Sequence, residues 1–272
     1  MSQMIFNPAA FVAPKAKPMP VILVLDNSGS MSGEKITSLN EAVRVMLETF
    51  KKAECDDAAF NLAIVTFGTG IHLLQPMTGV SQIHWQDIPI SSIEACKRLT
   101  GTWDDAAARG TPLGATLRIL KAMIEDKTVI PSRVYRPAII LVSDGHPTDK
   151  WSDSLAEFTQ EGRSSKCDRW AMAIGRDADA GTLGKFIAGI KNEDGTPRKL
   201  LYANDAKTLK DNFSFITMSV TNSVATASQS KVLTVRPITV VPTCVNEGHD
   251  APKLAQKPMT QQKAEEDDDG FW

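Results

Sequence analysis

The chain has 272 residues, of which 42% are hydrophobic and 23% are charged, so it can bury a sizeable core as one large domain or two small ones. Its formal net charge of −2 provides no overall positive field, which argues against nucleic acid and anionic membranes as partners. No apolar run approaches a membrane span in length, and residues 1–20 lack the basic start and long apolar core of a signal peptide. These features predict a cytoplasmic globular protein.

The four cysteines are far apart in the sequence and form no C-x-x-C pair, which argues against a zinc site. In a reducing compartment, cysteines with this distribution remain unpaired. We expect free, buried thiols at Cys55, Cys96, Cys167 and Cys244.

The prolines of residues 1–20 predict an extended lead-in, and we place the start of the folded domain at residue 18. Residues 21–25 are a continuous aliphatic run, which is typical of a strand buried on both faces of a parallel sheet. The run stops at Asp26, and Ser28 and Ser30 follow at alternating positions of a polar loop. Sites in open α/β sheets form just beyond the carboxyl ends of strands, so Asp26 stands where a site is expected.

Strand and helix patterns then alternate along the chain. Apolar residues spaced by three and four positions predict helices at 34–52, 112–127, 151–165, 180–190 and 205–219, with a short helix at 91–99. Further strands are predicted at 60–67, 71–74, 137–143, 169–174 and 200–202. This alternation predicts an α/β fold with a mostly parallel central sheet, one antiparallel edge strand at 71–74, and helices on both faces.

Two later segments carry side chains that match the polar loop at residue 26. Thr111 follows Gly110 and precedes a helix, and Asp144 ends the aliphatic strand at 137–143. Together with the Asp-x-Ser-x-Ser spacing, these positions resemble the metal ion-dependent adhesion site of the von Willebrand factor A (VWA) family. The resemblance implies a doubly wound, Rossmann-like VWA fold. An alternative for Asp26, Ser28 and Thr111 is helix capping.

The resemblance also implies a ligand set. The metal ligands would be Asp26, Ser28, Ser30, Thr111 and Asp144. Carboxylate and hydroxyl oxygens suit Mg²⁺ or Mn²⁺, and in the family one coordination position stays open for a carboxylate of a protein partner. We therefore expect a metal-dependent interaction module and not an enzyme.

Several stretches resemble a narrower group, the bacterial cytoplasmic tellurium-resistance-associated (TerY-like) VWA proteins. They include residues 25–36 and 110–117, and residues 142–151 with their Pro-Thr-Asp-x-Trp continuation. The resemblance implies a role in a stress, tellurium-resistance or defence system, with a co-encoded phosphatase and kinase as candidate partners.

The predicted VWA domain spans residues 18–220, and residues 221–272 form a predicted extended or disordered tail. The tail ends in five acidic residues followed by Gly270, Phe271 and Trp272. It resembles the acidic, aromatic-tipped tail of bacterial single-stranded-DNA-binding proteins, so Phe271 and Trp272 are candidate partner-binding residues. The alternative is a solubilising tail.

Two further functions remain open from the sequence. One is a metal-dependent phosphatase or hydrolase, for which only His146 and Asp149 could be put forward as catalytic groups. The residues after Asp26 lack a second Asp of the aspartyl-phosphate type, and the chain has no Gly-x-x-x-x-Gly-Lys loop. The other is a scaffold that acts through its acidic tail.

Overall fold

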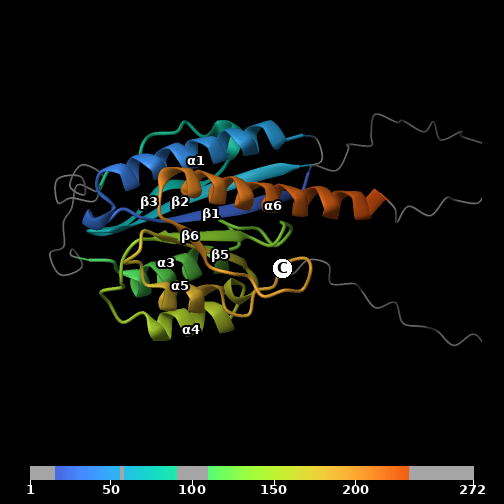
Figure 1. Ribbon diagram of the computed structural model, residues 1–272. Helices are drawn as coiled ribbons and strands as arrows, with labels where there is room; N and C mark the ends of the chain where they lie inside the picture. The colour runs from blue at the N-terminus through green and yellow to red at the C-terminus, as the bar shows by residue number, and fades with distance from the viewer. Residues whose placement is uncertain (1–15, 56–57, 91–109, 233–272) are drawn as a thin grey trace, which may run out of the picture.

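The computed structural model of the chain describes residues 16–55, 58–90 and 110–232, and these form one central sheet flanked by helices (Figure 1). The strand order is β3-β2-β1-β4-β5-β6, with β3 antiparallel to β2 and every other neighbouring pair parallel. The strands are β1 (Pro18–Asp26), β2 (Ala59–Gly68), β3 (Gly70–Gly79), β4 (Ala138–Ser143), β5 (Asp168–Ile174) and β6 (Leu201–Ala203). This arrangement confirms the predicted α/β class and its single antiparallel edge strand.

Helices cover both faces of the sheet. The helices are α1 (Glu34–Ala53), α3 (Leu113–Glu125), α4 (Ser152–Gln160), α5 (Ala180–Ile187) and α6 (Ala206–Val232). Helices α1 and α6 lie on one face, and α3, α4 and α5 lie on the other (Figure 1). Successive residues of β1 alternate between the two cores: Leu23 packs on the α1 side, and Ile22 and Val24 pack on the α3 side. The unbroken aliphatic run at residues 21–25 thus reflects burial on both faces.

The strand β3 is longer than the four residues expected. It continues to Gly79 through Pro76, which the sequence had assigned to a loop at 76–89. Because β3 pairs only with β2, a proline there need not remove a ladder hydrogen bond, and the pairing is irregular between Leu62 and Val65.

The strand β1 also begins earlier than predicted, at Pro18. Residues 18–20 pair with β2 only, and pairing with β4 begins at Val21. The two prolines therefore precede the part of the strand that is hydrogen-bonded on both sides, so they interrupt no central ladder.

The largest differences between observed and predicted helix ends are in α4, α5 and α6. Helix α4 ends at Gln160 and not at 165, because Gly162 adopts a φ of +67° and a 3₁₀ turn (Ser164–Lys166) follows. Helix α5 ends at Ile187, three residues early. Helix α6 runs to Val232, 13 residues past the expected end, and its buried Val220 and Val224 continue the apolar stripe that packs in the α1-side core.

Some sequence predictions lie outside the described residues. These are the short helix at 91–99, most of the lead-in, and the tail from residue 233 onward with Phe271 and Trp272.

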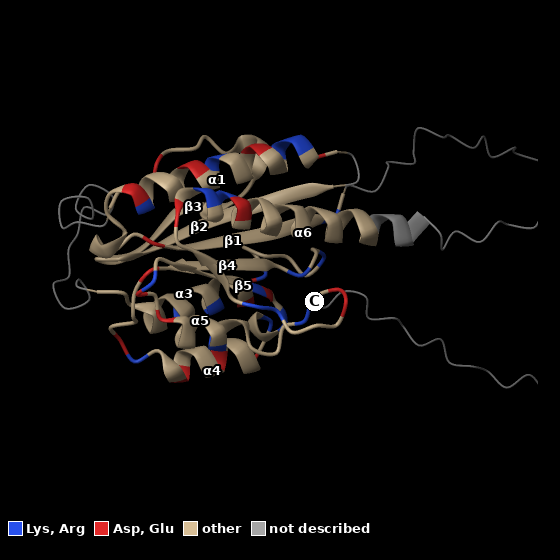
Figure 2. Cartoon of the chain, in the orientation of Figure 1, with Lys and Arg blue, Asp and Glu red and all other residues tan. Residues whose placement is uncertain are grey.

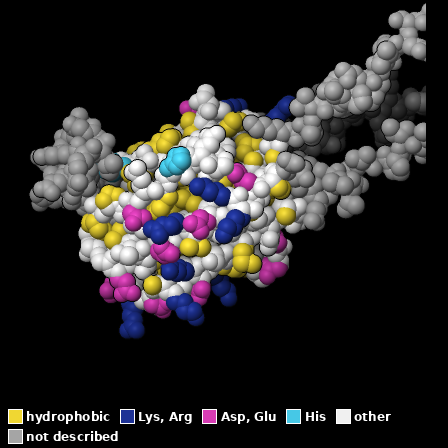
Figure 3. All heavy atoms as spheres, turned by 90° about the horizontal axis from the view of Figure 1, so that it is seen from above, with side chains coloured by type: hydrophobic (Ala, Val, Ile, Leu, Met, Phe, Trp, Pro, Cys, Tyr) yellow, Lys and Arg dark blue, Asp and Glu magenta, His cyan; other side chains and the backbone are white. Residues whose placement is uncertain are grey.

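Charged side chains of both signs are intermixed over the surface. Acidic and basic residues alternate along α1 (Figure 2), and the face seen in Figure 3 carries both signs among hydrophobic side chains. The exposed large hydrophobic residues on α1 and α6 are Val45, Phe215 and Met218. Within the described ranges, no helix combines the length and apolar character that a bilayer crossing requires.

Two of the four cysteines are described, and both are free thiols. Cys167 is buried, as predicted, and burial raises the pKa of its thiol to about 12. Cys55 is exposed, so the expectation of burial is wrong there, because this residue follows the C-cap of α1, Glu54, and is not part of the packed helix.

The two thiols should therefore differ in reactivity. Because only the thiolate attacks an alkylating reagent, the folded protein at pH 8 should be alkylated by iodoacetamide at Cys55 and protected at Cys167. Peptide mapping by mass spectrometry checks this, with urea-unfolded protein as the control in which both thiols react. Equal modification of the two residues in the folded protein would contradict the buried position of Cys167.

Candidate metal centre

The candidate centre lies where two adjacent parallel strands end. Asp26 is the last residue of β1 and is fully buried, and Asp144 directly follows β4 and is 4% exposed. The register that pairs Leu25 with Val142 brings the two strand ends level. Across this pair, the Ser143 hydroxyl donates a hydrogen bond of 2.6 Å to Asp26 Oδ2. Strand pairing alone therefore sets both carboxylates at one edge of the sheet.

The loop after Asp26 folds back over its own carboxylate. The Ser28 backbone N–H donates to Asp26 Oδ1 at 2.9 Å, and the hydroxyls of Ser28 and Ser30 lie 3.0 Å apart. The Ser30 hydroxyl donates to Asp144 Oδ1 at 2.7 Å. These contacts join four of the five predicted ligands into one continuous polar cluster.

Thr111 reaches this cluster from a third segment. Its backbone exchanges two hydrogen bonds with Thr148: the Thr111 N–H donates to Thr148 Oγ1 at 2.9 Å, and the Thr148 N–H donates to the Thr111 carbonyl at 3.0 Å. A Cβ placed on Gly145 would lie 3.5 Å from Thr111 Oγ1 and 3.9 Å from Ser30 Oγ. The structure thus brings all five predicted residues together at the carboxyl edge of the sheet.

The glycine before Thr111 permits this docking. Gly110 has a φ of +128°, and a Cβ there would come within 2.1 Å of Thr148 Oγ1. A side chain at position 110 would therefore push apart the two segments that hold Thr111 beside the strand ends.

Helix capping is the alternative explanation for Asp26, Ser28 and Thr111, but α3 is capped by a different residue and α1 has no side-chain cap. Asp149 accepts hydrogen bonds from the backbone N–H groups of Gly114 (2.9 Å) and Ala115 (2.8 Å), so it caps α3 in place of Thr111. Helix α1 begins after Gly33 without a side-chain cap. From the sequence, Asp149 is only a catalytic candidate. Its capping role could not be predicted, because it caps a helix some 35 residues away and no short sequence pattern links the two.

Burial makes the negative charge in the cluster costly. Burial raises the pKa of Asp26 above its ordinary value, although hydrogen bonds from Ser143 and Ser28 lower it, and the nearby Asp144 raises it further. A buried, ionised carboxylate of this kind is stabilised by a cation.

A lysine that the sequence analysis missed contacts the cluster. Lys35 Nζ donates to Asp144 Oδ2 at 2.5 Å and to the Ser30 carbonyl at 3.3 Å. Its position offered a weak signal, because it stands in the first turn of α1, where the helix dipole disfavours a cation.

The donor set fits a hard divalent cation. The side-chain polar atoms of the five predicted residues are all carboxylate or hydroxyl oxygens, which suit Mg²⁺ or Mn²⁺ better than a soft metal. The described residues contain no group of three or more His, Cys, Asp or Glu that could hold a metal. In the same loop, the buried Asn27 Oδ1 has no hydrogen-bond partner among the described residues.

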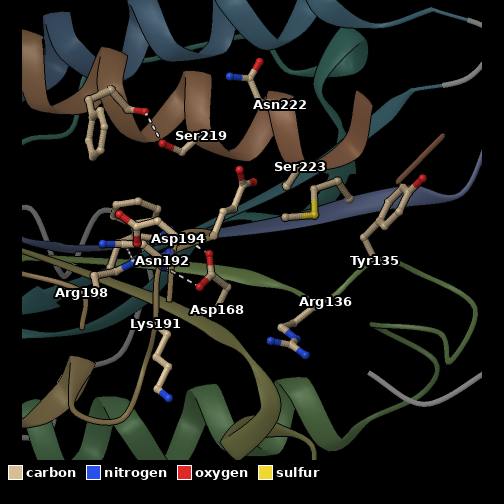
Figure 4. Close-up of a pocket in the computed structure, with 14 residues that line it drawn as sticks. Tyr135, Arg136, Asp168, Lys191, Asn192, Asp194, Arg198, Ser219, Asn222 and Ser223 are labelled. Atoms are coloured by element: carbon tan, nitrogen blue, oxygen red, sulfur yellow. Dashed lines mark hydrogen bonds and ion pairs between the residues drawn. The ribbon is translucent and has the colours of Figure 1, made fainter. Parts of the chain in front are cut away.

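A separate hollow of about 610 Å³ lies at the amino ends of the strands, between α6 and the loop that carries Lys191 and Asp194 (Figure 4). One of the cations that line it, Arg198, already has partners within the protein. Arg198 Cζ lies 3.5 Å from the centroid of the Trp170 ring, and Arg198 Nη1 pairs with Asp168 at 2.5 Å. The sequence predicted no site there.

Replacing Asp26 by Asn should stabilise the metal-free protein and abolish its response to metal. The raised pKa means that folded Asp26 binds its proton more tightly than the unfolded chain does, so this residue lowers stability as pH rises above the ordinary carboxyl range. Asn removes the charge, its Oδ1 can still accept from the Ser28 N–H, and its Nδ2 can donate to Ser143 Oγ in place of the hydrogen bond that Asp26 accepts. Melting curves at pH 5 to 8, in EDTA and in MgCl₂, check this. A lower Tm for the variant in EDTA at pH 7 would contradict it.

Replacing Asp149 by Ala should destabilise the fold by about 1–2 kcal/mol, because two N–H groups of α3 lose their acceptor. Urea unfolding measures this change. The affinity for Mn²⁺, measured by calorimetry, should stay close to that of the unchanged protein, and a loss of binding with no loss of stability would reassign Asp149 to the centre.

Part of the chain matches a known protein family. Residues 21–146 match the family model of the von Willebrand factor type A domain, and this stretch contains all five predicted ligands. A search of curated protein sequences found no match.

Solved structures show the same architecture at low sequence identity. A von Willebrand factor type A protein from Catenulispora acidiphila superposes with a TM-score of 0.51 and 22% identity, covering 76% of this chain and 43% of that one. The proximal thread matrix protein 1 of the mussel byssus, in a structure with a zinc-occupied MIDAS motif, gives a TM-score of 0.50 at 13% identity and coverages of 76% and 49%. The pilus adhesin SpaC of Lactobacillus rhamnosus GG gives a TM-score of 0.54 at 15% identity and coverages of 77% and 30%.

The chain therefore spans less than half the length of each of these structures. Sheet order, helix placement and the family match agree, and the fold of this chain is that of a von Willebrand factor type A domain.

Proposed function

We propose that this protein is a metal-dependent protein-interaction module. In this proposal Mg²⁺ or Mn²⁺ is held by Asp26, Ser28, Ser30, Thr111 and Asp144, and the centre binds a carboxylate of a protein partner. The observation that carries the proposal is the convergence of oxygen donors from three chain segments around a buried aspartate whose pKa is raised.

The residue types favour binding over chemistry. Three of the five donors are neutral hydroxyls, which withdraw little charge from a cation, and a divalent cation so bound supplies an open position for an anionic oxygen. The chain's own residues fix the geometry: Ser143 orients Asp26, and Thr148 holds the backbone of Thr111. This arrangement suits a receptor for an acidic side chain.

The two candidate catalytic residues, Asp149 and His146, are not placed as an acid–base pair. Asp149 uses both carboxylate oxygens to cap α3, and His146 is exposed. These observations support a non-enzymatic role. Turnover of a generic phosphoester that disappears in Asp26→Ala would favour the phosphatase alternative.

The cellular setting belongs to the same proposal. The Pro-Thr-Asp-x-Trp continuation and the loop at residues 25–36 support a bacterial cytoplasmic stress or tellurium-resistance system, with a co-encoded phosphatase and kinase as candidate partners. In the alternative scaffold function, Phe271 and Trp272 at the end of the acidic tail bind the partner.

The test is affinity capture from the native host with the full-length protein as bait, in MgCl₂ and in EDTA. A partner should be retained with Mg²⁺ and lost both in EDTA and with Asp26→Asn. Asp153→Asn is the matched control, because Asp153 is an exposed aspartate on α4. It should retain the partner.

Deleting residues 265–272 separates the alternatives. Capture that is indifferent to EDTA and to Asp26→Asn, and that is lost on this deletion, would contradict the proposal and assign recognition to the tail. Capture that survives the deletion in MgCl₂ assigns recognition to the metal centre.

A further inference from the structure

Lys35 stands between the candidate centre and solvent. Its ammonium covers Asp144, whose side chain is fully buried, while the Lys35 side chain itself is 39% exposed. The two oxygens of Asp144 face different partners: Oδ1 accepts from Ser30 inside the cluster, and Oδ2 accepts from Lys35 on its outer side. Lys35 can therefore hold the outer oxygen while the inner oxygen serves the centre.

The donors of Lys35 are not exhausted. An ammonium group has three N–H donors, and the described residues accept from two of them, through Asp144 Oδ2 and the Ser30 carbonyl. Gly175 lies next to it, since a Cβ placed there would be 3.6 Å from Lys35 Nζ, and the Lys35 side chain remains 39% exposed to solvent. The third N–H is available to a group that arrives from solvent.

The sum of the charges around the centre indicates what the third N–H of Lys35 could bind. Asp26 and Asp144 contribute two negative charges, and Lys35 contributes one positive charge. With a divalent cation the sum becomes +1, and it reaches zero only when one external carboxylate is added. Without Lys35, the two aspartates would neutralise the cation by themselves, and an incoming carboxylate would make the centre negative.

We propose that Lys35 is a partner-binding residue, which donates a hydrogen bond to the same carboxylate that occupies the open position of the metal. This inference rests on the proposed function and identifies the residue that makes the loaded centre selective for an anion. A carboxylate has two oxygens, so one can face the metal and the other can accept from Lys35 Nζ.

The surroundings leave room for such a ligand. A cavity of about 160 Å³ opens beside Lys35 between the amino ends of α1 and α6, with Ile174, Ala203 and Leu209 among its walls. Glu34 and Asp205 also line it, so a carboxylate is repelled from those walls and attracted to the Lys35 end. Carbon atoms next to the carboxylate can occupy the apolar part of the cavity.

The test uses Mn²⁺ and acetate as probes, because each can be titrated separately on the full chain. Water proton relaxation reports Mn²⁺ binding and then the displacement of exchangeable water by acetate. In Lys35→Met, Mn²⁺ should bind several-fold more tightly, because a positive neighbour is gone, while acetate should bind about tenfold more weakly. Lys35→Arg should restore acetate affinity to within a few-fold of the unchanged protein.

The matched control is Lys207→Met, which removes an exposed lysine from the first turn of α6 at the same edge of the sheet. It should leave both affinities nearly unchanged. Opposite shifts for Mn²⁺ and acetate support the proposal, because a lysine that only orients Asp144 would weaken Mn²⁺ binding when removed.

Two results would overturn the inference, and they differ in whether the proposed function survives. If Lys35→Met weakens Mn²⁺ binding and leaves acetate affinity unchanged, Lys35 only positions Asp144 and the metal-centre proposal survives. If the unchanged protein binds no Mn²⁺, by relaxation and by Tm, the proposed function fails together with the role of Lys35.

Discussion

The parallel pairing of β1 with β4 is the constraint on which the rest of the structure depends. It is buried on both faces by helices, and it ends level at Asp26 and Ser143, so the hydrogen bond between these side chains follows from the register of the core. A one-residue slip of either strand would turn its core residues to the opposite face and would also separate the two carboxylates. Core packing and the candidate centre therefore share one determinant.

The centre is built at a cost to stability. Asp26 is buried as a carboxylate, Asn27 Oδ1 lacks a partner among the described residues, and Lys35 stands at the unfavourable end of a helix dipole. Each departs from what a chain selected for stability alone would contain. Such departures concentrate at functional positions, and here all three lie between the last residue of β1 and the first turn of α1.

The sequence was informative where local patterns reflect burial, and less so where distant segments meet. The aliphatic runs at residues 21–25 and 137–143 identified the central strands because burial on both faces leaves no polar positions. The capping of α3 by Asp149 and the contact of Lys35 with Asp144 could not be derived in this way, since each joins residues far apart in the chain. Pro76 and the end of α6 were misjudged because edge position and packing against α1 override local propensity.

Helix α6 has a consequence for how the molecule is organised in space. It begins at the cavity beside Lys35 and continues for 27 residues, which is about 40 Å at the rise of an α-helix. It runs along the sheet and extends past it (Figure 1). Val232 thus lies at the end of the described part of the molecule that is opposite the candidate metal centre. Helix α6 therefore places Val232 about one helix length from the cavity beside Lys35.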